Sequence, residues 1–394
     1  MGNAMSGENR DPLAAGPQRL VTRRRLVQAG AAGFAITITG MARRPVAAQD
    51  ASPAAGEPIK VAFVYVGPIG DLGWTYAHDQ GRLALEEAVP EAETVYQENV
   101  LEAASDSERV IRGFAQDGAK VIFTTSFGYM DPTINVAQDF PDTVFVHISG
   151  YKTEENVGTG FGKIEEPRYV SGLIAGKMTT ANKLGYVAAF PIPEVIRGIN
   201  AFALGVRASN PGATINVVWT STWFDPPKER AAGEALLDTG ADVIAQHQDT
   251  AGPQQAAEER GAYSVGYNSD MSAQAPEAVL TSAVWNWGPF YIDTVKQVQA
   301  DTWETSQFWG GWKDGTVDLA PIGPMVPDDV REMAQAEAEL FKSGEKDIFT
   351  IFTGPIMDQD GNEKVPAGES LTAEQLLGDY MKWFVEGVEG DPTP

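Results

Sequence analysis

From Lys60 onward, apolar runs rich in Val, Ile and aromatic residues alternate with segments of helical periodicity, and this alternation limits the possible fold more than any other feature. The run VAFVYV (61–66) is apolar throughout, as in a strand buried on both faces of a sheet. The helical segment YAHDQGRLALEEA (76–88) follows it. Strands that alternate with helices form parallel, doubly wound sheets. The sequence therefore predicts an α/β fold.

The alternation runs through four strands and then starts again, which indicates two similar lobes. A chain of 394 residues is also longer than one ordinary core requires. We expect the junctions near residues 177–184 and 280–288. The predicted N-terminal lobe comprises residues 58–177 and 284–325. The predicted C-terminal lobe comprises residues 178–283 and part of 326–394.

The N-terminus has the pattern of an export signal. Arg23, Arg24 and Arg25 precede an apolar stretch from Ala29 to Met41, and small residues follow up to Ala48. This predicts a twin-arginine-type signal peptide over 1–48, with a Leu where such signals usually carry Phe. The apolar stretch is too short to span a membrane. Residues 49–57 (QDASPAAGE) are predicted to be a flexible linker, and the mature protein is expected outside the cytoplasm without a membrane span.

Charge and cysteine content exclude several classes of function. The chain has a net charge of −25, although its first 48 residues carry seven Arg and only two acidic residues. A body this acidic repels phosphate backbones, so we expect no nucleic-acid partner. The sequence has no cysteine, which excludes disulfides, thiolate metal sites and a cysteine nucleophile.

Aromatic, carboxylate, hydroxyl and amide side chains recur directly after the predicted strands, where ligands bind in open parallel sheets. The candidates in the first lobe are Asp71, Trp74, Thr75, Phe127, Tyr129 and Asp131. Those in the second lobe are Trp223, Asp249, Asn268, Asp270 and Trp285. The acids have an alternative role, because a carboxylate before a helix is also a helix cap. The recurrence at nearly every strand end predicts a ligand site in a cleft between the lobes.

These residue types favour a flat, uncharged ligand. Aromatic faces from two lobes can hold a ring between them, and Asp, Asn and Thr side chains can bind its polar edge. Lys and Arg are scarce at the same positions, so a phosphate or a free carboxylate is not expected on the ligand.

Signals for catalysis, metals and cofactors are weak. His78 lies in a predicted helix and His147 in a predicted buried strand, while His247 follows a strand without a nucleophilic serine motif. The segment DQDGNE (358–363) does not have the spacing of a calcium loop and predicts a turn. We therefore predict no catalytic residue, no metal and no cofactor. An exported enzyme that cleaves nucleosides with His247 and Asp249 is kept as an alternative.

Four stretches together resemble the BMP family (basic membrane protein, purine-nucleoside-receptor-like) of ABC-importer substrate-binding proteins: GDLGWTYAHDQGR, TTSFGYMDP, TWFDPPKE and GPFYIDTVK. The resemblance covers roughly residues 58–357. It implies a type I periplasmic-binding-protein fold, with two lobes joined by a multi-segment hinge. It also implies an importer whose permease and ATPase subunits are the partners, and a purine as ligand.

The resemblance also assigns roles to individual residues. Trp74 and Trp223 occupy the positions of the two stacking aromatics, and Asp131 that of the base-reading acid. Where nucleoside binders hold ribose with an Asp and a Lys, this chain has Asn268 and Trp285. Because that change removes an acid and a cation, we expect a free purine base of the adenine, guanine or hypoxanthine type. The alternatives are a purine nucleoside or a sugar in the same importer role, or a ligand sensor without transport.

Overall fold

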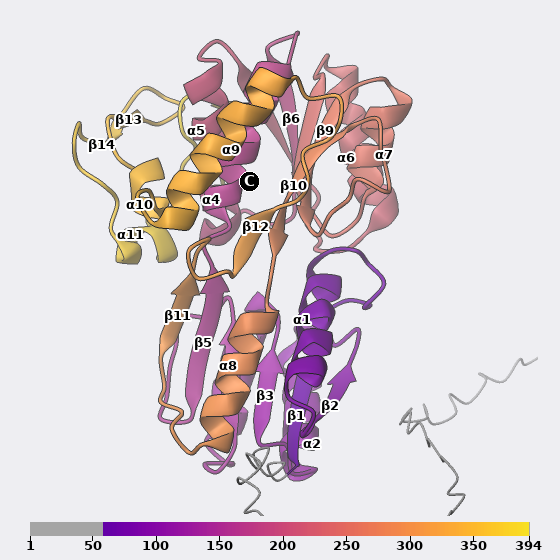
Figure 1. Ribbon diagram of the computed structural model, residues 1–394, viewed down its shortest axis with the longest axis vertical. Coiled ribbons are helices and arrows are strands. Elements are labelled where there is room, and N and C mark those ends of the chain that lie inside the picture. Colours follow the sequence, from indigo (N-terminus) through magenta and orange to yellow (C-terminus); the bar gives the residue numbers. More distant parts are fainter. Residues whose placement is uncertain (1–57, 394) are drawn as a thin grey trace, which may run out of the picture. The chain divides into compact units, whose positions relative to one another are not determined.

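The computed structural model describes residues 58–393, and the strands of this part form two large sheets and a small two-stranded one. The first sheet is entirely parallel, in the order β11-β5-β4-β3-β1-β2 (Figure 1). Its strands are β1 (Ile59–Val64), β2 (Ala92–Gln97), β3 (Val121–Thr124), β4 (Val144–Ile148), β5 (Val157–Gly162) and β11 (Gln307–Gly310).

Helices cover both faces of the first sheet, which explains why its strands are apolar on both sides. The helices α1 (Trp74–Ala88) and α8 (Gly288–Gln299) pack together, and so do α2 (Ala104–Gln116) and α3 (Met130–Ala137). In β1, Val61 and Phe63 belong to the apolar cluster that includes Tyr291 of α8, whereas Ala62 and Val64 belong to the cluster of α2 and α3. The short helix η1 (Phe127–Tyr129) precedes α3.

The second sheet repeats this architecture in the order β12-β10-β9-β8-β6-β7-β15, with β12 antiparallel to β10. Its strands are β6 (Lys183–Ala188), β7 (Thr214–Trp219), β8 (Val243–His247), β9 (Tyr263–Asn268), β10 (Val279–Trp285), β12 (Val317–Leu319) and β15 (Val388–Glu389). Its helices are α4 (Glu165–Met178), α5 (Pro193–Ser209), α6 (Pro226–Asp238), α7 (Gly252–Glu259) and α9 (Asp328–Ser343).

The chain passes between the two sheets three times: after β5, after β10 and after β11 (Figure 1). Two sheets of this kind with three crossings define the type I periplasmic-binding fold, which confirms the predicted fold class. Within residues 58–393, no helix is both long and apolar enough to cross a membrane. The predicted signal peptide and linker, residues 1–57, lie outside the described part.

The lobe boundaries differ from those expected. Helix α4 falls in the predicted N-terminal segment 58–177, but it packs against α5 and α9 of the second lobe. Strand β12 falls in the predicted segment 284–325, but it pairs with β10 in the second sheet. Helical periodicity shows that a helix has a buried face without showing which sheet it covers, and α4 is buried along most of its length.

A buried ion pair ties α4 to α5 and to the C-terminal segment. Arg197 donates from Nε to Oε1 of Glu165 over 2.6 Å, and both side chains are almost fully buried. Arg197 also donates from Nη1 to the carbonyl of Leu376 in α11 (Ala373–Leu377). The C-terminal segment further contains α10 (Ile348–Ile351) and the pair β13 (Ile356–Met357) and β14 (Glu363–Val365). Asp358 accepts from the N–H groups of Asp360 and Asn362, as the predicted turn requires.

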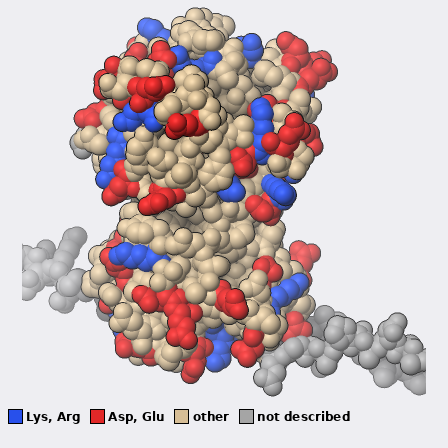
Figure 2. Space-filling model, turned by 90° about the vertical axis from the view of Figure 1, so that its left-hand side faces the viewer, with Lys and Arg blue, Asp and Glu red and all other residues tan. Residues whose placement is uncertain are grey.

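Charged side chains are spread over both lobes (Figure 2). On the face shown, acidic residues form several groups with Lys and Arg between them. The acidic excess is therefore distributed over this face of the protein rather than gathered at one lobe.

Candidate functional site

A cavity lies between the lobes at the carboxyl ends of the parallel strands. Its volume is about 30 Å³, enough for only a few water molecules. A ring-sized ligand therefore enters only when the lobes or the lining side chains move apart. The first lobe lines the cavity with Val66, Trp74, Ser126, Phe127 and Ser149. The second lobe lines it with Glu194, Trp223, His247, Asp249, Tyr267 and Asn268.

Trp74 is the first residue of α1, and its indole is held in place from several sides. Its Nε1–H donates to the carbonyl of Thr125 over 2.6 Å. The ring lies edge-on to His78 at 4.3 Å and to Trp285 at 5.5 Å, measured between ring centroids. Because these contacts restrict the ring, it is organised before any ligand binds.

Trp223 reaches the same cavity from the opposite lobe, on the loop between β7 and α6. Its ring packs against Phe190 at 4.9 Å and lies 6.4 Å from His247, again between centroids. The structure thus brings Trp74, Trp223 and Phe127, three of the aromatic candidates, to one cavity.

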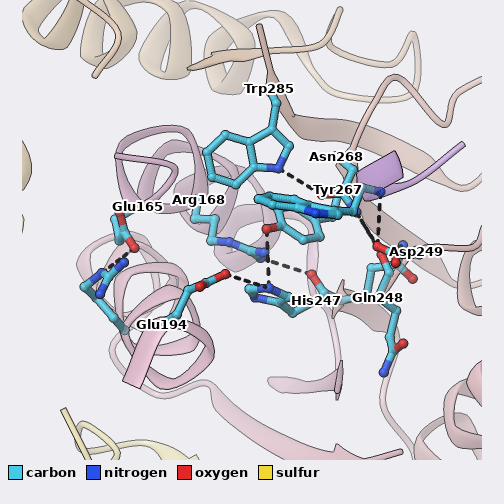
Figure 3. Close-up of polar contacts among 12 residues, drawn as sticks. Glu165, Arg168, Glu194, His247, Gln248, Asp249, Tyr267, Asn268 and Trp285 are labelled. Atoms are coloured by element: carbon cyan, nitrogen blue, oxygen red, sulfur yellow. Dashed lines mark hydrogen bonds and ion pairs between the residues drawn. The ribbon is translucent and has the colours of Figure 1, made fainter. Parts of the chain in front are cut away.

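The amide of Asn268 is already occupied by the protein (Figure 3). Its Nδ2 donates to Asp249 over 2.9 Å and to the carbonyl of Gln248, while its Oδ1 accepts from Trp285 Nε1 over 2.9 Å. Trp285 is buried behind Trp74 and is not part of the cavity wall. These two candidates therefore shape the site, and little of the amide remains for a ligand.

Glu194, His247, Tyr267 and Arg168 form a polar group on the second lobe (Figure 3). Glu194 Oε1 lies 3.9 Å from His247 Nε2, and the guanidinium of Arg168 lies 3.9 Å from the centre of the Tyr267 ring. Burial raises the pKa of Glu194 to about 7 and lowers the pKa of His247 well below its usual range. Near neutral pH the imidazole is therefore neutral, and Glu194 is present in both its protonated and its ionised form.

Sequence reasoning did not select Glu194 or Tyr267, although both line the cavity. Glu194 follows Pro193 in the first turn of α5, the helix that comes after β6. A search for carboxylates in the first turn of each helix that follows a strand would have found it. Tyr267 is inside strand β9, so no signal in the sequence separated it from ordinary core residues.

Five candidates lie elsewhere. Tyr129 is fully buried and donates to the carbonyl of Val100, and Asp131 is an exposed residue paired with Lys152. Asp270 is exposed and accepts from the N–H of Ser272. The Oγ1 of Thr75 accepts from the N–H of Gly67. Asp71 lies two residues before Gly73, the N-cap residue of α1, and accepts from the N–H groups of Gly73 and of Tyr76 in the first turn.

One physical cause explains why the side chains of Tyr129, Asp131 and Asp270 lie away from the cavity. Each follows a strand, as a ligand residue would, but the short helix or turn after that strand rotates its side chain away from the cavity. In the segment 127–131, Phe127 faces the cavity while Tyr129 enters the core. The spacing along the sequence does not determine which of these rings points inward.

Gly73 allows the two lobes to approach closely. A Cβ at this position would fall inside van der Waals contact with the backbone of Asp249 in the opposite lobe. We expect Gly73→Ala to obstruct closure and weaken ligand binding at least about tenfold, measured by calorimetry. Gly70→Ala is the matched control, because no atom lies within 4 Å of its added Cβ. Equal binding by both variants would contradict this account of closure.

Two lobes of parallel sheet, with a cavity between them lined by aromatic rings, define a ligand-capturing protein of the periplasmic-binding class. Residues 59–350 match the Bmp family model, described as ABC transporter substrate-binding protein PnrA-like. The chain belongs to this family, as its sequence motifs suggest.

Two relatives support the same class and differ in the ligand that their names state. The purine-binding protein of Brucella abortus (strain 2308) is 47% identical over 85% of this chain and 94% of its own length. A putative ABC transporter glucose-binding protein of Haloferax volcanii is 45% identical over 86% of this chain and 82% of its own.

Solved structures agree on the fold. An ABC transporter solute-binding protein from Conexibacter woesei has a TM-score of 0.61 at 25% identity, over 74% of this chain and 99% of its own. A solute-binding protein from Aeropyrum pernix has a TM-score of 0.65 at 20% identity, over 73% of this chain and 92% of its own. The chain is therefore an ABC transporter substrate-binding protein, from a family of binding proteins rather than enzymes.

Proposed function

We propose that this protein captures a purine base outside the cytoplasm and delivers it to the permease of an ABC importer. The observation that carries the proposal is that Trp74 and Trp223 line one cavity from opposite lobes. When the lobes close on a planar heterocycle, each indole can cover one of its faces. Each aromatic pair contributes about 0.5–1.5 kcal/mol beyond the burial of area. The signal peptide proposed for residues 1–48 would export the chain.

The polar groups of the cavity suit the edge of such a ring. Glu194 can accept N–H groups of the heterocycle when it is ionised, and can also donate when it is protonated. The neutral His247 beside it offers one donor and one acceptor. No Lys or Arg is among the residues that line the cavity, which favours a neutral ligand over a nucleotide.

The same site favours the free base over the nucleoside. The resemblance places the groups that hold ribose at the positions of Asn268 and Trp285. In this protein those two side chains bind each other. A ribose hydroxyl at this place would have to displace a buried hydrogen bond, and an unpaired buried group costs about 1–3 kcal/mol.

A hexose is the second candidate, because one relative at 45% identity is named a glucose-binding protein. Indole faces also pack against sugars, so the tryptophans alone do not separate the two ligands. A hexose carries hydroxyls around its whole rim, and the cavity offers polar side chains such as Ser126, Ser149 and Glu194. Direct comparison of the two ligands in a binding experiment therefore has to separate them.

Calorimetry with adenine, hypoxanthine, adenosine and glucose tests the proposal. We expect one of the bases to bind with the highest affinity and adenosine to bind at least about tenfold more weakly. Native mass spectrometry of freshly purified protein supplies an independent reading, since a co-purified ligand would appear as an added mass. Tighter binding of glucose than of either base would reject the purine assignment and leave the importer role in place.

A further inference from the structure

The lobes also contact each other directly beside the cavity, through what we call the closure contact. It joins Leu72, Gly73 and Trp74 of the first lobe to Asp249 and Ser269 of the second. The N–H of Trp74 donates to Oδ1 of Asp249 over 3.1 Å, and the hydroxyl of Ser269 donates to the carbonyl of Leu72. The residue whose ring lines the cavity is thus also bonded through its backbone to the opposite lobe.

Asp249 is buried in this contact and has only neutral donors around it. Its Oδ1 accepts from the Trp74 N–H of α1 and from Nδ2 of Asn268 in β9. Among residues 58–393, neither Asp249 nor Asp71 forms an ion pair with a Lys, Arg or His. A carboxylate that loses its water without gaining a cation is costly to keep ionised.

Two other acids add to that cost. Asp71 lies in the loop before α1 and accepts from the N–H groups of Gly73 and Tyr76, while its Oδ2 is buried without a partner. Glu229 of α6 accepts from the N–H and the hydroxyl of Thr250, next to Asp249. Both N–H donors to Asp71 come from its own lobe. The approach of Asp249 is therefore the part of this arrangement that depends on closure.

We propose that Asp249 is a positioning residue, and that closing the lobes, which seats Trp74 over the ligand, is coupled to the uptake of a proton by the Asp71–Asp249 pair. In the open form Asp249 would be hydrated and far from Asp71. In the closed form two buried carboxyl groups share the start of α1, and protonation of one of them removes their repulsion. The coupling belongs to closure itself and does not depend on which ligand is bound.

The titration of both acids in the closed form supports this coupling. Burial, together with the charges of Asp71 and Glu229, raises the pKa of Asp249 well above its ordinary value. Burial raises the pKa of Asp71 to about 6. A group with a raised pKa in the closed form binds its proton more tightly there than in the open form. Lower pH therefore favours closure, and ligand affinity falls as the pH rises through the closed-form pKa.

Calorimetry in buffers of different ionisation enthalpy counts the protons taken up on binding. With adenine as the probe near pH 6, the pKa of Asp71 in the closed form, we expect net proton uptake, and an affinity that falls by up to about tenfold per pH unit as the pH rises. Asp249→Asn keeps the acceptor for the Trp74 N–H and should lower the uptake to near zero. Asp71→Asn should lower it as well, while the exposed Asp142→Asn is the matched control.

Glu194 is the other group that can take up a proton in this pH range, because burial raises its pKa to about 7. Uptake that persists in Asp249→Asn and disappears in Glu194→Gln would assign the proton to the cavity wall and overturn the proposal. Absence of uptake by the native protein between pH 5.5 and 8 would overturn it as well.

If neither adenine nor glucose binds, the proposed function fails and the closure contact is tested without ligand. The native sequence has no cysteine, so spin labels attach only at introduced sites such as Leu101→Cys and Lys228→Cys, one on each lobe. We expect the short-distance population to grow from pH 8 to pH 5.5, and this growth to be lost when Asp249→Asn is added. A distance distribution unchanged by pH in the native background would overturn the coupling.

Discussion

Replacing Trp74 by alanine is expected to weaken ligand binding by at least about 30-fold, which corresponds to about 2 kcal/mol. The substitution removes one of the two indoles that line the cavity from opposite lobes. It also leaves a void beside Trp285 and His78, because the ring packs edge-on to both. Calorimetry with adenine measures the loss, and thermal unfolding without ligand separates it from any loss of stability.

Two further variants test whether the loss of affinity comes from the loss of stacking by Trp74. Trp74→Phe keeps an aromatic face and loses the hydrogen bond to the carbonyl of Thr125, so it should retain an intermediate affinity. Trp303→Ala removes an indole that lines a separate cavity of the first lobe and should bind as the native protein does. If Trp74→Ala bound normally, the proposal that its ring covers the ligand would have to be abandoned.

Replacing Arg197 by methionine is expected to lower the free energy of unfolding by about 3–5 kcal/mol, because it leaves the buried carboxylate of Glu165 without its cation. The carbonyl of Leu376 loses its donor at the same time, which loosens the C-terminal segment from α5. Chemical denaturation of the native and variant proteins gives the difference.

The double variant Glu165→Leu with Arg197→Met should recover much of this loss, since no charge is then buried alone. Arg112→Met breaks an ion pair with Asp139 in which both side chains are substantially exposed, and it should cost at most about 1 kcal/mol. A loss of the same size in the exposed and the buried variant would mean that the buried pair contributes no more than a surface contact.

The strand and helix order could be predicted from sequence because each element carries its own periodic pattern. VAFVYV is apolar on both faces, and in the structure α1 and α8 cover one face while α2 and α3 cover the other. The placement of α4 could not be predicted in this way. Its periodicity fits either sheet, and only its packing against α5 and α9 decides between them.

The candidate site was predicted in part for a similar reason. Residues after strands were correctly expected to converge at the carboxyl edge, and Trp74, Trp223, Phe127, Asp249 and Asn268 line the cavity. The direction of each side chain depends on the turn that follows its strand. Tyr129 and Asp131 therefore belong to the core and the surface, although both follow the same strand as Phe127.

The sequence by itself determined the α/β class, the presence of two lobes and the family, because these follow from periodicity and from motifs that are local in the chain. Only the tertiary structure decided that Asp249 bonds to the start of α1 across the lobes, that Asn268 binds Trp285, and that Glu194 faces His247. Each of these contacts joins different helices, strands or lobes, so it is set by how those elements pack in three dimensions rather than by any local pattern.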